Sequence, residues 1–461
     1  MKQTIFFILI ILSCVIGYSQ KQINVHLAYN ASTKIYLYTF DGFNKTLADS
    51  GITNEEGKVT LISPKNYKGM GIVSLENAGD IFVVLGEKNV DINMKTLQDY
   101  YNPRIQSKEN VLFDELMLKH QKNKKILFGL YWLKPLYEGE NDKSENFIIH
   151  EIDSIEKVEK GLIAELPESM YISYYLPLRW YVESIPGSLQ GTGEKIPVLI
   201  NDFLKIDFSD DRIWHSGLLN GLLENYLIMC ESAGVNSPQF DSVYTLVNSA
   251  TDFIFQTIKG DPEKTNEMAG YLFKLYEKRS LFPCAEYLSL YFLEDTENYC
   301  LITDKLNRQM EQYRVMRKGN PSPDIVFNDP LDKYNKLSEI DSYYTLVFFW
   351  ASWCGHCMKE LPKLLALNDK LVENSIQVLT VSLDTDEKDF KEAIQYYPWL
   401  NYCDFKSWDG NAAKNFYVYA TPTIYLINNN TGSIVIKLAD GRQLEAFIDQ
   451  GYLNNMLGTK K

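Results

Sequence analysis

The chain has 461 residues, of which 45% are hydrophobic and 23% charged, enough for roughly two to four domains with cores of their own. Its formal net charge of −14 argues against nucleic acid and against an anionic membrane surface as partners. Seven cysteines in a chain of this length are too few for a fold built on a disulfide scaffold.

The first residues have the order of an export signal. Met1-Lys2-Gln3 is a short basic start, Ile5 to Ile16 is apolar, and Gly17-Tyr18-Ser19 offers a cleavage site between small residues. We expect residues 1–19 to be removed on export, which places the mature protein in the periplasm. Two alternatives keep it at a membrane, namely lipidation of Cys14 and an uncleaved signal that acts as an anchor, for which the apolar run is short.

Residues 20–100 are predicted to form a β-sandwich-like domain. Short β-type runs are separated by turn signals such as Asn54-Glu55-Glu56-Gly57. The predicted strands are Ile23–Ala28, Lys34–Phe40, Lys58–Ser63, Gly71–Leu75, Ile81–Leu85 and Val90–Met94. Such a domain serves either as a docking module or as a spacer, and the sequence leaves both open.

Residues 101–318 are predicted to form an all-α bundle or short solenoid, because apolar residues recur every three or four positions. Turn signals at Pro186-Gly187, at Asn236 to Pro238 and at Lys259-Gly260-Asp261-Pro262 divide the helices. The predicted helices are Val111–Leu136, Phe147–Leu166, Gly217–Cys230, Val243–Ile258 and Thr265–Arg279.

The most informative motif is Cys354-Gly355-His356-Cys357, which directly follows an apolar run that ends at Trp350. A helix that starts at Cys354 would direct its free N–H groups and positive dipole end at that sulfur, which favours the thiolate. Cys357 lies one turn further on the same helix face, so it can resolve a mixed disulfide formed by Cys354. The spacing therefore predicts a reversible, redox-active disulfide.

Two other interpretations of this motif are half of a zinc site and a static disulfide. Zinc needs two further ligands, and the five histidines form no second cluster. A static disulfide needs neither the aromatic Trp353 before it nor a Gly-His interior. Redox chemistry is thus the preferred interpretation.

The remaining cysteines are expected to lie outside the chemistry. A Cys284–Cys300 bridge is one option in an oxidising compartment, although sequence cannot assign it. Cys403 is predicted to be a buried core thiol rather than a third redox partner. Cys230 carries no specific expectation.

Two further strands complete the C-terminal pattern. Gln377 to Ser382 is β-branched and apolar, and Thr421-Pro422-Thr423 precedes a third apolar run. Because proline cannot donate to a sheet ladder, it belongs at the first residue of a strand or at an edge. A cis bond between Thr421 and Pro422 would account for its place.

Residues 319–461 resemble the thioredoxin-like proteins of the TlpA/ResA type, which are periplasmic or membrane-associated thiol–disulfide oxidoreductases. The resemblance rests on the Phe-Trp-Ala-Ser-Trp-Cys strand end, on the residues around the second cysteine and the proline, and on the entry segment. The matching positions are Gly319, Pro321, Pro323, Asp324, Glu360, Pro362 and Thr421-Pro422-Thr423. Residues 20–100 look like the β-rich domain that often precedes such modules in exported proteins of the Bacteroidetes type, through Ala48-Asp49-Ser50 and the Gly57 turn.

The resemblance implies a thioredoxin-like α/β fold with Cys354 as nucleophile and Cys357 as resolving thiol. It implies that Pro422 is a cis-proline that binds extended substrate backbone, and we expect Thr421 and Trp353 to contribute to substrate binding. It also implies that Glu360 lies behind the cysteines and helps to move a proton to or from Cys357. The spacing agrees with this in part, although a solvated helix charge is the alternative for Glu360.

The chain departs from the family at two positions. Phe348 stands where thioredoxin has a buried aspartate, so proton handling must rest on Glu360, His356 or water. Gly355-His356 is the dipeptide of protein disulfide isomerase rather than the proline-containing dipeptides usual in these reductases. Because His356 can stabilise the Cys354 thiolate, we expect a reduction potential nearer about −180 mV than about −270 mV.

The sequence thus predicts a multidomain protein, with a signal at 1–19, a β-sandwich at 20–100, a helical domain at 101–318 and a redox domain at 319–461. Its predicted function is an exported enzyme that reduces or exchanges disulfides in extracytoplasmic proteins and is recycled by a membrane or periplasmic redox partner. The alternative is a periplasmic binding protein in which the redox domain is auxiliary. No metal, nucleotide or flavin motif is apparent, and no cofactor is expected.

Overall fold

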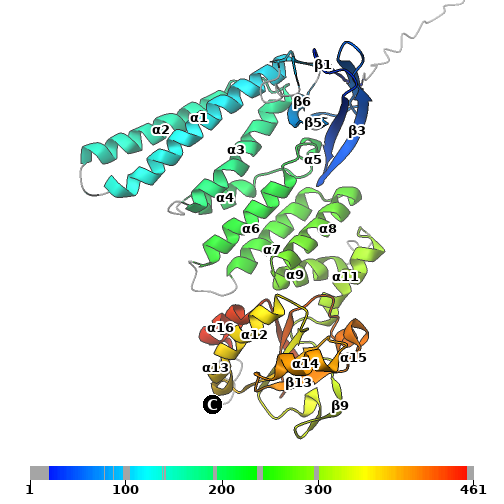
Figure 1. Ribbon diagram of the computed structural model, residues 1–461. Coiled ribbons are helices and arrows are strands. Elements are labelled where there is room, and N and C mark those ends of the chain that lie inside the picture. Colours follow the sequence, from blue (N-terminus) through cyan, green and yellow to red (C-terminus); the bar gives the residue numbers. More distant parts are fainter. Residues whose placement is uncertain are drawn as a thin grey trace, which may run out of the picture. The chain divides into compact units, whose positions relative to one another are not determined.

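The computed structural model describes residues 20–76, 78–86, 88–96, 104–137, 139, 142–190, 195–235, 242–294 and 301–453. They form two compact units, divided between Tyr226 and Leu227. Along the chain, β-rich, helical and α/β segments follow one another (Figure 1), as predicted. The export signal with Cys14 and one half of the suggested Cys284–Cys300 bridge lie outside the described residues.

The first unit begins with two four-stranded sheets, in the orders β4-β1-β7-β8 and β3-β2-β5-β6. Alternate residues of β1 and β2 are buried, as expected for strands with one face on a core. All six predicted strands form. The strands are β1 Gln22–Leu27, β2 Lys34–Asp41, β3 Asn44–Ile52, β4 Lys58–Ile62, β5 Gly69–Leu75, β6 Asp80–Leu85, β7 Val90–Met94 and β8 Arg104–Ile105.

Helices of the first unit pack against this β-rich part through a shared core of Met70, Val84, Phe113 and Tyr175. The buried Asn110 side chain accepts a 2.7 Å hydrogen bond from the Val84 amide and donates a 2.9 Å bond to its carbonyl. The helices are α1 Lys108–Tyr137, α2 Asp142–Ala164, α3 Tyr171–Gln190, α4 Ile196–Phe203, α5 Asp211–Trp214 and α6 Leu219–Val235, the last of which crosses the unit boundary.

The predicted turn at Pro186-Gly187 is wrong, because α3 continues through Pro186 to Gln190. A proline inside a helix removes one hydrogen bond and costs about 3 kcal/mol. Buried side chains along α3, including Tyr171, Ile172 and Leu176, offset this cost.

The second unit contains the later helices and the C-terminal α/β fold. Its helices are α7 Ser242–Thr257, α8 Pro262–Lys278, α9 Phe282–Leu293 and α11 Asp304–Val315. The predicted turn at 259–262 is the start of α8, where the Asp261 side chain accepts from the Lys264 amide at 3.1 Å and Pro262 takes the first helical position. The predicted helical region 101–318 therefore contributes to both units.

The C-terminal fold is built on a five-stranded sheet of order β13-β12-β11-β14-β15. Strands β11, β12 and β13 are parallel, whereas β14 and β15 run antiparallel to their neighbours. The strands are β11 Tyr344–Trp350, β12 Ile376–Ser382, β13 Leu400–Cys403, β14 Thr423–Asn428 and β15 Ser433–Leu438, preceded by the hairpin β9 Val326–Leu331 and β10 Tyr334–Lys336.

Strand β11 lies at the centre of this sheet, and all seven of its residues are buried, which explains its continuous apolar run. Its carboxyl end leads directly into the segment that carries Cys354. The accompanying helices are α12 Cys357–Ala366, α13 Asn368–Glu373, α14 Glu387–Ile394, α15 Asn411–Asn415 and α16 Gly441–Asp449. Among the helices that the structure describes, none combines the length and apolarity required to span a bilayer.

Candidate active site

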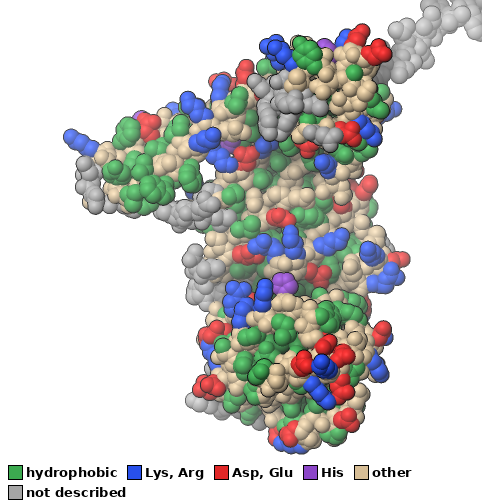
Figure 2. Space-filling view, viewed as in Figure 1, with side chains coloured by type: hydrophobic (Ala, Val, Ile, Leu, Met, Phe, Trp, Pro, Cys, Tyr) green, Lys and Arg blue, Asp and Glu red, His purple; other side chains and the backbone are tan. Residues whose placement is uncertain are grey.

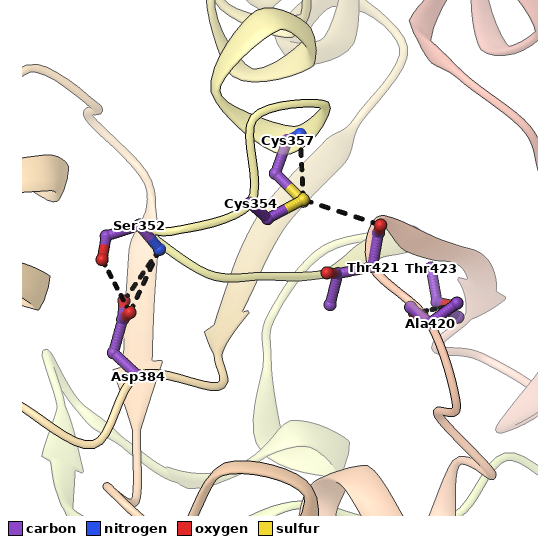
Figure 3. Close-up of a disulfide and its surroundings, with 7 residues drawn as sticks. All are labelled: Ser352, Cys354, Cys357, Asp384, Ala420, Thr421 and Thr423. Atoms are coloured by element: carbon purple, nitrogen blue, oxygen red, sulfur yellow. Dashed lines mark hydrogen bonds between the residues drawn. A yellow bond between two sulfur atoms is a disulfide. The ribbon is translucent and has the colours of Figure 1, made fainter.

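Cys354 and Cys357 form a disulfide between the end of β11 and the start of α12, with their Cα atoms 5.3 Å apart (Figure 3). Cys354 is 8% exposed and Cys357 is fully buried. Cys354 is thus the outer sulfur of the pair, although little of it is exposed. Only Cys354 Sγ can therefore attack a sulfur of another molecule or be attacked by one.

The helix begins three residues later than predicted, at Cys357 rather than Cys354. Residues 352–356 form turns, and the amide of Cys354 donates to the Ala351 carbonyl at 3.1 Å. The physical expectation still holds, because the amide of Cys357 in the first turn of α12 donates to Cys354 Sγ at 3.1 Å. An amide donor and the positive end of a helix both stabilise negative charge on that sulfur.

The Thr421–Pro422 peptide bond is cis, as predicted. Cys354 Sγ lies 3.6 Å from the Thr421 carbonyl oxygen, and the Thr423 hydroxyl donates to the Ala420 carbonyl at 2.8 Å (Figure 3). The segment before β14 therefore lies directly beside the outer sulfur. This places backbone atoms where an extended substrate segment would meet the disulfide.

Aromatic side chains flank the cysteines. Trp353 is 59% exposed, and its ring centroid lies 6.2 Å from that of Trp408, which is 40% exposed. Tyr419, two residues before Thr421, is 71% exposed. Hydrophobic side chains also gather on the face of this domain that carries α12 and α14 (Figure 2).

The structure places His356 and Glu360 differently relative to the sulfurs. His356 is exposed beside the disulfide, at the residue that precedes α12. The Glu360 carboxylate is mostly buried, pairs with Lys363 at 2.5 Å and accepts from the Gly441 amide at 3.5 Å. The role of Glu360 in moving a proton to Cys357 remains a prediction.

A buried carboxylate that the sequence reasoning missed lies beneath the cysteine segment. Asp384 is 1% exposed. It accepts hydrogen bonds from the Ser352 amide at 3.1 Å and from the Ser352 hydroxyl at 2.7 Å (Figure 3). The Ser382 hydroxyl also donates to it at 2.7 Å. The sequence feature that could have indicated this carboxylate is the polar pair Ser382 and Asp384, at the carboxyl end of a strand parallel to β11.

Asp384 does not stand at the position of the buried thioredoxin aspartate. Phe348, at the position where thioredoxin has its buried aspartate, is 1% exposed and lies in the apolar core. The carboxylate comes instead from the residues after β12, and it holds the main chain two residues before Cys354. We therefore regard Asp384 as a positioning residue.

The other described cysteines, Cys230, Cys284 and Cys403, are buried, and none forms a disulfide within the described part of the chain. Cys403 was predicted to be a buried core thiol. Its Sγ donates to the Asp384 carbonyl at 3.3 Å, and burial raises its pKa to about 11. It therefore stays a protonated thiol at neutral pH and is a poor nucleophile. Within the described part of the chain, no group of three or more His, Cys, Asp or Glu side chains is arranged to hold a metal ion.

Comparisons with known proteins agree with this geometry. Residues 342–434 match a family model described as thioredoxin-like. Tryparedoxin of Trypanosoma brucei brucei is 34% identical over 101 residues, which cover 22% of this chain and 70% of that protein. The thiol-disulfide oxidoreductase ResA of Oceanobacillus iheyensis is 24% identical over 155 residues, 33% of this chain and 79% of that protein.

Among solved structures, a thiol:disulfide interchange protein from Bacteroides sp. is 26% identical, with 32% of this chain and 95% of that chain covered and a TM-score of 0.27. The match to the family model contains both cysteines and Pro422. Through its C-terminal domain, the chain therefore belongs to the thioredoxin-like family, and its relatives include thiol-disulfide oxidoreductases named ResA.

Proposed function

We propose that this protein is an exported enzyme that reduces or exchanges disulfides in extracytoplasmic proteins through Cys354 and Cys357. The observation that carries the proposal is the asymmetry of the pair. Cys354 Sγ accepts a 3.1 Å hydrogen bond from the Cys357 amide and lies 3.6 Å from the Thr421 carbonyl oxygen, whereas Cys357 is fully buried. This asymmetry supports Cys354 as the attacking sulfur and Cys357 as the resolving sulfur.

Starting from the reduced pair, the Cys354 thiolate attacks one sulfur of a substrate disulfide. A Cys354–substrate bond forms, the substrate disulfide breaks, and the released substrate thiolate takes a proton from solvent. Cys357, as a thiolate, then attacks Cys354 Sγ, which forms the internal disulfide and releases the second substrate thiol. Two electrons pass to the substrate, and the dithiol of a redox partner restores the pair.

The exposed rings of Trp353, Trp408 and Tyr419 support a polypeptide as the substrate. Large aromatic side chains that stay exposed beside a reactive group are common at protein-binding surfaces. In the proposed complex, the substrate lies extended along Thr421 and Pro422, with apolar side chains on these rings. Glu360 and His356 are the candidate groups for proton handling.

The proposal of export rests on the basic start, apolar stretch and small residues that follow one another within residues 1–19. The periplasm is the proposed location. Lipidation of Cys14 or an uncleaved signal would instead keep the protein at a membrane. Fractionation of cells that express the full chain separates these cases, because a cleaved signal gives a soluble extracytoplasmic protein of lower mass, and lipidation gives a membrane-bound one.

Reduction of insulin by dithiothreitol, followed as turbidity, tests the activity. We expect the wild-type protein to accelerate the reaction, Cys354→Ser to abolish the acceleration, and Cys403→Ala to retain it, because Cys403 is a buried thiol outside the pair. Equal rates with wild type and Cys354→Ser would contradict the proposal and favour the binding-protein alternative.

A further inference from the structure

The second unit contains a cavity of about 130 Å³ that is separate from the disulfide site. It lies between helices α9 and α11 on one side and strands β14 and β15 with α16 on the other. Rings from α9, α11, β14 and α16 line it. None of its lining residues belongs to the site around Cys354. The proposed redox chemistry therefore leaves this cavity without a role.

Lys437, on β15, supplies a cation to the cavity wall. Its Nζ lies 4.5 Å from the ring centroid of Phe282, 4.8 Å from that of Tyr313 and 5.9 Å from that of Tyr425. Its one hydrogen bond to the residues that the structure describes is a 3.5 Å bond to the Tyr313 hydroxyl, which in turn donates to Glu277 at 3.1 Å. The Glu277 carboxylate acts on this ammonium group through space and through Tyr313, and no ion pair joins Lys437 to a carboxylate of the described residues.

Two more polar groups at the cavity wall lack partners. Tyr425 is 2% exposed and Gln312 is 8% exposed, and both line the cavity. Neither the Tyr425 hydroxyl nor the Gln312 side-chain amide forms a hydrogen bond within the part of the chain that the structure describes. Neither group is among the fully buried side-chain atoms that lack a partner in the described residues, so both polar ends stay open to the cavity and can bond to a ligand.

The electrostatics of the cavity favour an added anion. Burial lowers the pKa of Lys437 to about 8 and raises that of Glu286, on the same wall, to about 7. A negative group beside Lys437 would stabilise the charged form of the lysine that burial disfavours. Near neutral pH, Glu286 is partly protonated and can donate a hydrogen bond rather than repel an anion.

We propose that this cavity is a binding site for a small organic carboxylate whose apolar body is about the size of one aromatic ring. The carboxylate accepts hydrogen bonds from Lys437, Tyr425 and Gln312, and the apolar body packs among the rings of Phe282, Tyr313 and Phe447. The size follows from the volume, since a cavity of about 150 Å³ accommodates benzene. The charge of the ligand follows from a cation that has no carboxylate partner.

The test uses benzoate as the probe and the purified protein, with binding measured by calorimetry at slightly acidic pH. We expect one saturable site, and at least about tenfold weaker binding of the neutral isostere benzamide. Lys437→Met, which preserves much of the side-chain volume, should weaken benzoate binding about tenfold or more. Lys388→Met is the matched control, because Lys388 is 80% exposed on α14, and it should bind as the wild type does.

Tyr425→Phe removes a single hydroxyl and keeps the test decisive if Lys437→Met fails to fold. We expect this variant to bind benzoate at least about threefold more weakly than the wild type. Cys354→Ser should bind benzoate like the wild type, so failure of the redox proposal would leave this result unchanged. The absence of saturable benzoate binding, or binding that neither Lys437→Met nor Tyr425→Phe weakens, would overturn the proposal.

Discussion

The carboxylate of Asp384 and the main-chain amide of Ser352 lie 3.1 Å apart, which joins the residues after β12 to the segment that carries Cys354. The Ser352 and Ser382 hydroxyls donate to the same carboxylate at 2.7 Å. One buried acid thus fixes the main chain two residues before the outer sulfur.

Asp384→Ala should lower both stability and turnover. It leaves the buried donors of Ser352 and Ser382 without an acceptor, and we expect a loss of about 2 kcal/mol or more in the free energy of unfolding. Insulin reduction at a temperature where the variant is folded should fall severalfold, because the position of Cys354 is no longer fixed. Asp341→Ala, at an 86% exposed carboxylate, is the control. Full activity in folded Asp384→Ala would rule out the positioning role.

Trp408→Ala should weaken the use of protein substrates more than the use of small ones. Its half-exposed ring lies beside that of Trp353, so we expect KM for a protein disulfide to rise about three- to tenfold with little change in kcat. The rate with glutathione disulfide should be unchanged. Tyr343→Ala is a control at the other end of β11, and an equal effect of both substitutions would count against an aromatic docking surface.

His356→Pro should make the reduction potential more negative, from near about −180 mV toward about −270 mV, because it removes an imidazole that can stabilise the Cys354 thiolate. Equilibration of the protein with glutathione measures this shift. His356→Ala separates loss of the ring from the stiffness of proline and should move the potential in the same direction. If both variants keep the wild-type potential, His356 is only an exposed turn residue.

Glu286→Gln should change how stability depends on pH. Burial raises the pKa of Glu286 from 4.5 to about 7, so the folded state binds more protons than the unfolded state between these values. The group therefore lowers stability as pH rises through this window, and the penalty persists above it. Denaturant unfolding should show the variant more stable than the wild type by about 3 kcal/mol at pH near 8 and similar at pH near 4. Glu392→Gln, at an exposed carboxylate on α14, should show no such difference, and parallel curves for Glu286→Gln and wild type would contradict the argument.

Sequence reasoning predicted those parts of the fold whose signals are local. The apolar run of Tyr344 to Trp350 is a fully buried central strand, and Pro422 forms a cis bond before β14. Strand β3 was missed because most of its residues are polar and exposed, so no alternation marks it. The turn expected at Pro186 was wrong because burial along α3 outweighs the local cost of proline.

The site was predictable where it depends on spacing and not where it depends on tertiary packing. Cys354 and Cys357 are paired as expected. Asp384 and Ser352 are 32 residues apart in sequence, and only the parallel pairing of β11 with β12 brings them together. The spacing of Glu360 predicted that it lies on the helix of Cys357, but it did not predict its partners. Its carboxylate pairs with Lys363 and accepts a hydrogen bond from the Gly441 amide at the start of α16.

The most direct test of the account is covalent trapping on the outer sulfur. Reduced Cys357→Ala protein is incubated with insulin, quenched with acid and analysed by peptide mass spectrometry, beside reduced Cys354→Ala as the matched variant. We predict a mixed disulfide on Cys354 in the first protein and none on Cys357 in the second, because Cys357 is fully buried. No adduct on Cys354, or a more abundant one on Cys357, would contradict the assignment of attack and resolution.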